Sequence, residues 1–520
     1  MTFHKHESRK SKVSFKDPIE IISSASDDSS HYESPYTMTE EILQKRYSQT
    51  NTGRFITQFC AAIVACLSSF SFGTLLGWSR IDFSPSSAPS MTCTEESWVV
   101  SLMPLGCSLA FIPSFYIMNS LGPKKTMVFD TTIYILSFLI VVRTGNQKSF
   151  IVSRFVTGFV GTIYFCSAER LLMDAVHRKN LTYMLVLVRL SLLLGLLASY
   201  IFGYFKGRAQ LIIFCTCIPI VNLLLLMILP ESPAFLYKKN ERQAMEALQW
   251  YLGADNIYNV MHCLQSDADK YRSASDTNRY ILFSKCVTKA LLLVTFTNFF
   301  KAFSGYYVFV LYSLLNDETR LIVFSEFTDS TIFLTTILVM NALVGCIRCI
   351  INFGVRKPLI LSSTIVTCAL LAETAYLYMI YLEILDQTFN QKFGVQIIIL
   401  TLFVVGYTLG FEYCPDVLLY DYLPFQVQTI AKYITRTLYW FFIFILTRSF
   451  IFITSCVKHH FGLLMLSAVS TIGVMYCYIF IIETKGKNLL QIQIEIGGNP
   501  IGNRGAYRSR IDVPLMQDAL

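Results

Sequence analysis

Residues 55–78, FITQFCAAIVACLSSFSFGTLLGW, form an apolar stretch without a single charged residue. About 20 apolar residues in a helix cross a hydrocarbon core of about 30 Å, so this stretch is long enough to span a bilayer. Eleven more stretches of similar character follow it. We place them at about 97–118, 126–143, 149–170, 182–205, 209–229, 287–315, 330–352, 358–382, 394–422, 430–454 and 461–482.

The composition agrees with a membrane protein. Of the 520 residues, 53% are hydrophobic and only 15% are charged, whereas a soluble domain has about 25% charged residues. A lipid-exposed segment must satisfy its own backbone hydrogen bonds, and these apolar runs are too long for barrel strands. The sequence therefore predicts an all-α integral membrane protein with twelve transmembrane helices.

A polar segment divides the spans six and six, which predicts five regions. These are a disordered cytoplasmic tail (1–54), an N-terminal six-helix bundle (55–229), a cytoplasmic linker with short amphipathic helices (230–285), a C-terminal six-helix bundle (286–482) and a cytoplasmic tail (483–520). Within the linker, Asn240 is a good N-cap for a helix that stops at Gly253.

Lysine and arginine in the tails and short loops predict the orientation. Cytoplasmic loops of multispan proteins are enriched in these residues, and with twelve spans the basic segments all fall on one side. Both termini are therefore expected in the cytoplasm. The residues that decide this are Lys45, Arg46, Arg54, Lys124, Lys125, Arg178, Lys179, Arg356, Lys357, Lys485 and Lys487. The lysine and arginine residues of these loops and tails also account for the net charge of +8, so the charge does not indicate a nucleic-acid partner.

Two six-helix halves joined by a loop are typical of transporters built from repeats with a central binding site. A receptor, a channel or a scaffold can have the same number of spans. The sequence contains no Walker, H-E-x-x-H or G-x-S-x-G motif, so nothing in it supports ATP-driven transport or an enzyme. Cys346 and Cys349 have C-x-x-C spacing inside a span without further ligands nearby, and we predict neither a metal nor a cofactor.

Four motifs point further, and two of them occupy corresponding places at the ends of spans six and twelve. They are Glu96-Ser97-Trp98 at the start of span two, Pro230-Glu231-Ser232-Pro233 after span six, Ala247-Leu248-Gln249-Trp250-Tyr251-Leu252 in the linker, and Glu483-Thr484-Lys485-Gly486-Lys487 after span twelve. With these motifs the chain resembles the sugar-porter branch of the major facilitator superfamily. It looks most like the insect facilitated trehalose transporters, over roughly residues 55–492.

The resemblance implies a cytoplasmic gate of charged helix ends that closes between the two halves. The residues that match it are Asp174, Glu231, Arg356, Lys357, Asp421 and Glu483. Several partners in the family pattern are missing, because Pro123, Leu181 and Gln428 stand where the family has arginine. We therefore expect a gate with a different charge balance.

The resemblance also implies a substrate site on spans five, seven, eight, ten and eleven. The matching positions are Arg189, Lys301, Tyr307, Asn341, Glu412, Asp416, Tyr439 and Trp440. Most of the neutral amides with which the family binds sugar hydroxyls are replaced here, and Asn341 is retained. Ionisable residues within spans usually face a cavity and pair, so Arg189 is expected to pair with Glu412 or Asp416 across the halves.

Three interpretations of this unusual site remain open. The protein is a facilitative transporter of a small carbohydrate (trehalose or hexose-like) by alternating access, or it transports a charged or zwitterionic solute, or it is a transport-deficient sensor or scaffold. We favour the first, in a monomeric multi-pass protein of the plasma membrane. The sequence does not give the sugar, the direction of transport or any ion coupling.

Overall fold

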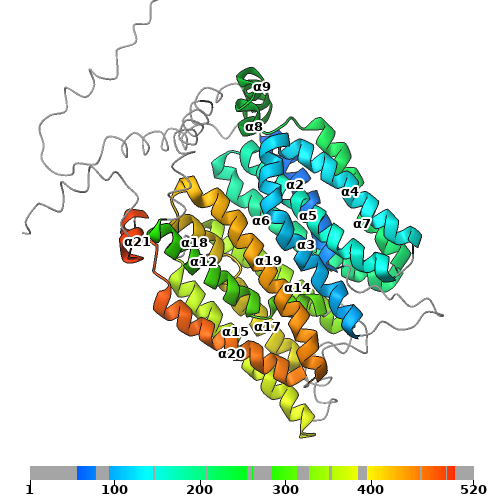
Figure 1. Ribbon diagram of the computed structural model, residues 1–520, viewed down its shortest axis with the longest axis vertical. Helices are drawn as coiled ribbons and strands as arrows, with labels where there is room; N and C mark the ends of the chain where they lie inside the picture. Colours follow the sequence, from blue (N-terminus) through cyan, green and yellow to red (C-terminus); the bar gives the residue numbers. More distant parts are fainter. Residues whose placement is uncertain are drawn as a thin grey trace, which may run out of the picture. The chain divides into compact units, whose positions relative to one another are not determined.

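The computed structural model describes residues 55–77, 93–144, 147–206, 208–253, 261, 284–312, 327–350, 354–384, 395–456, 459–487 and 489–497. The N-terminal tail, the C-terminal tail beyond residue 497, and linker residues 254–260 and 262–283 lie outside these ranges, and so does the predicted disorder of the N-terminal tail. Nearly all of the described residues are helical, and none of them forms a strand (Figure 1).

The first six long helices form what we call the N-terminal group. They are α2 (Phe55–Gly77), α3 (Cys93–Leu121), α4 (Pro123–Thr144), α5 (Gln147–Ala175), α6 (Arg178–Lys206) and α7 (Arg208–Ile228). Two short helices follow, α8 (Pro233–Tyr237) and α9 (Glu241–Leu252).

The helices of the remaining spans, some of them short, form the C-terminal group. They are α12 (Lys285–Phe303), α13 (Tyr306–Tyr312), α14 (Phe327–Ile350), α15 (Arg356–Tyr381), α17 (Val395–Leu409), α18 (Cys414–Tyr422), α19 (Phe425–Cys456) and α20 (His459–Phe480). The short helix α21 (Leu489–Glu495) comes last among the described elements.

Every predicted span coincides with a helix or a consecutive pair of helices. Among the described residues, ten segments are long and apolar enough to cross a membrane, with α12 and α13 forming one and α17 and α18 another. The other two predicted spans correspond to α4 and to α14, whose apolar part is the shorter segment Thr331–Ile347. The all-helical, multi-pass architecture is therefore confirmed.

Two spans are broken near their middle. The seventh bends at Ser304 and Gly305, where Gly305 has a φ of +88°, a conformation that glycine adopts without steric cost. The tenth is interrupted between Leu409 and Cys414. Interrupted helices leave backbone carbonyls without helical partners, which is tolerated in a membrane only where protein or water can satisfy them.

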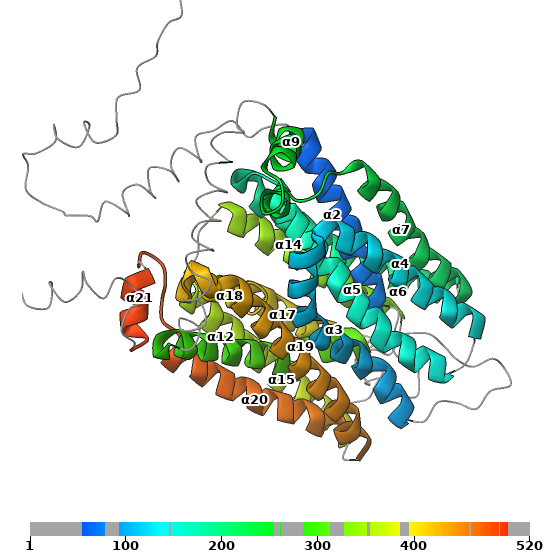
Figure 2. The ribbon, with the colours of Figure 1, turned by 45° about the horizontal axis from the view of Figure 1, so that its top comes forward.

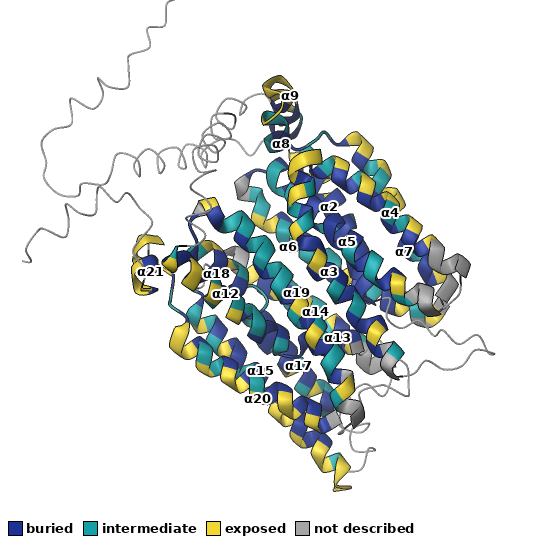
Figure 3. Ribbon diagram, in the orientation of Figure 1, coloured by how far each residue is buried: buried dark blue, intermediate teal, exposed yellow. Residues whose placement is uncertain are grey.

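The two groups meet along two helix pairs. Helix α19 packs along α3, and α14 packs along α6; the first pair lies side by side in Figures 1 and 2. Gly345 of α14 lies against Val186 of α6, where a β-carbon would come within 2.9 Å of the valine side chain. Large apolar side chains remain exposed on the outer faces, including Ile213, Leu224, Ile472 and Tyr478 (Figure 3), as expected of surfaces that contact lipid.

Helix α9 follows the sequence prediction. Asn240 accepts a hydrogen bond from the Arg242 amide, and Gly253 ends the helix with a φ of +84°. Its Tyr251 hydroxyl donates to the Pro230 carbonyl (3.0 Å). Burial and the carboxylates of Glu231 and Asp174 raise the pKa of Tyr251 well above its usual range. The hydroxyl therefore stays protonated and can donate this hydrogen bond.

Helices α2 and α6 pack at very close range through glycines. A β-carbon on Gly195 would lie 2.2 Å from the Phe70 carbonyl oxygen, which is shorter than any non-bonded contact. Small residues at helix interfaces permit such close approach in membranes. We expect Gly195→Val to force the helices apart and lower stability by about 1–3 kcal/mol, the usual cost of overpacking.

The measurement is the melting temperature of the purified chain in detergent. Gly203→Val on the same helix is the matched control, because a β-carbon there would meet only the end of the Leu211 side chain at 3.0 Å. Equal melting temperatures for the two variants would contradict the assigned α2–α6 packing.

Candidate functional site

A cluster of ionised side chains joins the two groups near the middle of the spans. Arg189 Nη1 of α6 lies 3.4 Å from Glu412 Oε1, and Arg189 Nη2 lies 4.0 Å from Asp416 Oδ2 of α18. Lys301 Nζ of α12 lies 3.9 Å from Glu412 Oε2. Four predicted site residues from three spans therefore come together.

The break in the tenth span supplies a second set of contacts. The Glu412 carbonyl lies between α17 and α18 and accepts hydrogen bonds from Lys301 Nζ (3.1 Å) and Arg189 Nη1 (3.5 Å). Two cationic side chains thus satisfy a carbonyl at the helix break. Because hydrogen bonds to charged groups are stronger than neutral ones, this arrangement stabilises the break as well as the ion pairs.

Aromatic rings surround the charges. Tyr307 packs against Trp440 and Tyr439, with centroid distances of 5.4 Å and 6.2 Å. Lys301 Nζ lies 5.1 Å from the centroid of the Tyr439 ring, and the Arg189 guanidinium lies 4.9 Å from that of Tyr413. Ring faces of this kind can bind cations and also the apolar face of a sugar.

The predicted site residue Asn341 lies beside this cluster, on α14. Its backbone carbonyl accepts a hydrogen bond from the Tyr413 hydroxyl (3.2 Å), and its Nδ2 donates to the Ile337 carbonyl. Its buried Oδ1 has no hydrogen-bond partner in the described part of the chain. This oxygen is therefore an acceptor that a ligand hydroxyl can use.

A second cluster joins the groups closer to α8 and α9. Glu169 of α5 forms a bidentate pair with Arg436 of α19, at 2.6 Å and 3.2 Å, and an ion pair with Lys432 at 2.9 Å. The sequence analysis did not predict this cluster. The available signal was the i, i+4 spacing of Lys432 and Arg436, which places two cations on one helix face within a span.

The predicted gate residues of the N-terminal group lie at helix ends. Asp174 pairs with Arg170 (3.2 Å) and accepts a hydrogen bond from the Ser232 hydroxyl (2.6 Å). Glu231 accepts hydrogen bonds from the backbone amides of Lys124 and Lys125 at the start of α4. A carboxylate stabilises a helix N-terminus, where amides lack partners.

The C-terminal group repeats this arrangement. Glu483 accepts a hydrogen bond from the Val355 amide at the start of α15 (3.0 Å), as Glu231 does at α4. Arg356 donates to the Tyr478 carbonyl, Lys357 is exposed, and Asp421 lies near Thr484. All these contacts stay within one group in this structure, so a gating role for the six residues stays a prediction.

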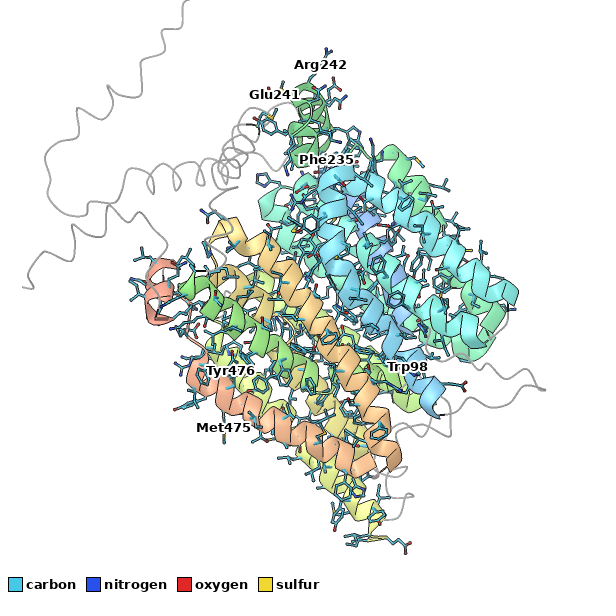
Figure 4. The ribbon with its side chains drawn as sticks, viewed as in Figure 1. Trp98, Phe235, Glu241, Arg242, Met475 and Tyr476 are labelled. Atoms are coloured by element: carbon cyan, nitrogen blue, oxygen red, sulfur yellow. The ribbon has the colours of Figure 1, made fainter. Side chains whose placement is uncertain are left out.

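The groups also meet at the other end of α3. Arg448 of α19 donates a hydrogen bond to the Ser97 hydroxyl, and its guanidinium lies 4.3 Å from the centroid of the Trp98 ring. Figure 4 shows Trp98 far from Phe235 and Arg242, which mark the end with α8 and α9. Contacts between the groups therefore occur near both ends of the α3–α19 pair.

The described residues include no cluster of three or more histidines, cysteines or carboxylates that is arranged to hold a metal ion. The groups around Arg189 and Tyr307 are ion pairs, hydroxyls and aromatic faces, and such groups suit reversible binding of a polar solute.

Comparison with known proteins assigns this architecture to a family. The family model described as "Sugar (and other) transporter" matches residues 30–495. The chain belongs to the sugar transporter family. A facilitated trehalose transporter of Anopheles gambiae is 24% identical over 474 residues, which cover 89% of this chain and 59% of that protein. This family member thus spans about three fifths of that relative's length.

Other relatives agree. A homologue of a facilitated trehalose transporter in Drosophila sechellia is 23% identical, with 84% of this chain and 89% of that protein covered. The inward-open structure of the xylose transporter XylE from E. coli superposes with a TM-score of 0.67 at 15% identity, covering 84% of this chain and 99% of XylE. The structural likeness confirms the major facilitator fold.

Two substitutions test the ion pairs of Glu169 with Arg436 and Lys432. Glu169→Gln leaves two buried cations without their partner, and uncompensated buried charge costs about 3–5 kcal/mol. Lys432→Gln leaves the bidentate Glu169–Arg436 pair intact. We therefore expect a clearly larger fall in melting temperature for Glu169→Gln, measured on purified protein in detergent; an equal or smaller fall would contradict the pairing.

Proposed function

We propose that this chain is a facilitative transporter that moves a small carbohydrate, trehalose or hexose-like, by alternating access. The observation that carries the proposal is the convergence of Arg189, Lys301 and Glu412 at the break between α17 and α18. Broken helices in transporters of this architecture hold the substrate near the bilayer midplane. The names of the relatives support a sugar as the solute.

The position of the charges fits alternating access. Arg189 belongs to the N-terminal group, whereas Glu412 and Asp416 belong to the C-terminal group. If the groups rock against each other, these pairs break and reform, and a bound solute can replace the lost hydrogen bonds. Pairs of 3.4–4.0 Å that are partly solvated are weak enough for such exchange.

The predicted role of the gate residues is part of this proposal. Asp174, Glu231, Arg356, Lys357, Asp421 and Glu483 would control opening at the side of α8 and α9. Burial and the nearby Arg170 lower the pKa of Lys238, and Asp174 opposes them, so several charges are coupled at this end. We further propose the predicted five-region organisation, a monomer, and a location in the plasma membrane with both termini in the cytoplasm.

Uptake of labelled trehalose and D-glucose into cells that express the full chain tests the transport proposal. We expect saturable uptake, and we expect Arg189→Gln to reduce kcat/KM by about tenfold, because it removes a donor and leaves two carboxylates short of a partner. Arg242→Gln, which changes an exposed arginine on α9, is the control that should leave uptake unchanged.

Surface expression of each variant must be measured in parallel. Absence of uptake by the unmodified chain at normal surface levels would contradict transport of these sugars and favour a sensor or scaffold.

The orientation has its own test. Epitope tags at the two ends should become accessible to antibody only after the plasma membrane is permeabilised, because the basic loops are expected on the cytoplasmic side. Labelling of either tag on intact cells would contradict the proposed topology.

A further inference from the structure

The charges between the two groups do not balance. The two clusters together contain four bases, Arg189, Lys301, Lys432 and Arg436, and three acids, Glu169, Glu412 and Asp416. The clusters are coupled, because Asp416 interacts electrostatically with Arg436 and Lys432 as well as with Arg189 and Lys301. Arg170 and Asp174, the next charged side chains on α5, pair with each other. One positive charge is therefore left over among these described residues.

The close contacts leave Lys432 and Arg436 with the fewest acidic partners. Among the described residues, Glu169 is the one carboxylate within ion-pair distance of both bases, whereas Arg189 pairs with Glu412 and Asp416, and Lys301 pairs with Glu412. The side chains of Lys432 and Arg436 are only 14% and 22% exposed. An uncompensated charge at such burial is costly, and an anion that binds to these two bases lowers that cost.

Helix α19 places aromatic rings next to the surplus charge. Arg436 follows Lys432 by four residues, and Tyr439 and Trp440 follow Arg436 by three and four residues, so all four side chains share one face. That face points toward the N-terminal group, since Arg436 contacts Glu169 and the Trp440 ring lies 6.0 Å from the Phe72 ring. A ring-shaped solute against Tyr439 and Trp440 therefore places a substituent within about one helical turn, 5.4 Å, of Arg436.

Neutral groups that can bind hydroxyls also come from other helices of the C-terminal group. The free Oδ1 of Asn341 is one acceptor, and Tyr407 and Tyr439 have their hydroxyls 3.5 Å apart. The structure thus combines an aromatic face, hydroxyl partners and a surplus cation. A neutral sugar uses the first two features only, whereas a sugar with a carboxylate uses all three.

We propose that the preferred solute is an acidic sugar, such as a uronic acid, whose carboxylate binds at Lys432 and Arg436 while its ring packs against Tyr439 and Trp440. This inference rests on the proposed transport function and specifies its substrate class. The incoming carboxylate competes with Glu169 for the two bases. Binding therefore weakens an ion pair that joins α5 to α19 and couples occupancy to separation of the groups.

D-Glucuronate and D-glucose are the probes, because they differ only in a carboxylate in place of a hydroxymethyl group. Uptake of both is measured in liposomes containing the purified full chain. We expect the KM of glucuronate to be lower by about tenfold, which corresponds to about 1.4 kcal/mol. Lys432→Gln removes the surplus charge and should abolish this preference, whereas Lys432→Arg retains the charge and should retain the preference.

Arg242→Gln again serves as the surface control and should not change the ratio of the two KM values. Uptake of glucose or trehalose without a preference for glucuronate would overturn the acidic-sugar proposal and leave carbohydrate transport standing. If no sugar is taken up, the transport proposal fails. The melting temperature of the purified chain, measured with and without each sugar, then shows whether the anion site exists. Stabilisation by glucuronate but not by glucose, lost in Lys432→Gln, would support the anion site; its absence would overturn it.

Discussion

The structure depends on one constraint: inside a hydrocarbon core each backbone amide and carbonyl must find a partner within the protein. The spans meet this constraint as helices, and in the described part of the chain the seventh and tenth are interrupted. At the break in the tenth span, Lys301 and Arg189 donate to the Glu412 carbonyl. The same two cations pair with the Glu412 side chain. The side chains that satisfy the backbone carbonyl at the break therefore also form the polar cluster between the two groups.

In both groups, a glutamate after the last span accepts hydrogen bonds from backbone amides at the start of another helix. Glu231 accepts hydrogen bonds from amides at the start of α4, and Glu483 does so at the start of α15. Equivalent contacts at equivalent places are expected of a fold built from repeated halves. Between the halves the contacts are of another kind: ion pairs from Arg189 and Glu169, and the contact of Arg448 with Trp98. The Arg189 pairs are partly solvated and add little net stability, whereas the Glu169 cluster is largely buried and the loss of its carboxylate is costly.

Much of the fold could be predicted from residues alone. Apolar stretches gave the spans because hydrophobic length is a local property, and Asn240 and Gly253 gave the bounds of α9 for the same reason. The candidate site could be predicted in part. Arg189, Lys301, Glu412 and Asp416 were predicted because they match substrate positions of the family that the chain resembles, and charge inside a span is rare. Lys432 and Arg436 match no such position, and their pairing with Glu169, more than 260 residues away in sequence, is visible only in the fold.

The sequence by itself therefore determined the membrane location, the helical spans and the presence of ionisable groups where a sugar porter has amides. Hydrophobicity and helix capping act over a few residues, so they can be inferred without knowing the fold. Only the tertiary structure decided which charges meet, that one carboxylate serves two bases, and that the resulting imbalance lies beside Tyr439 and Trp440. Ion pairing depends on distances of a few ångströms between helices that are far apart in the chain, and packing alone sets those distances.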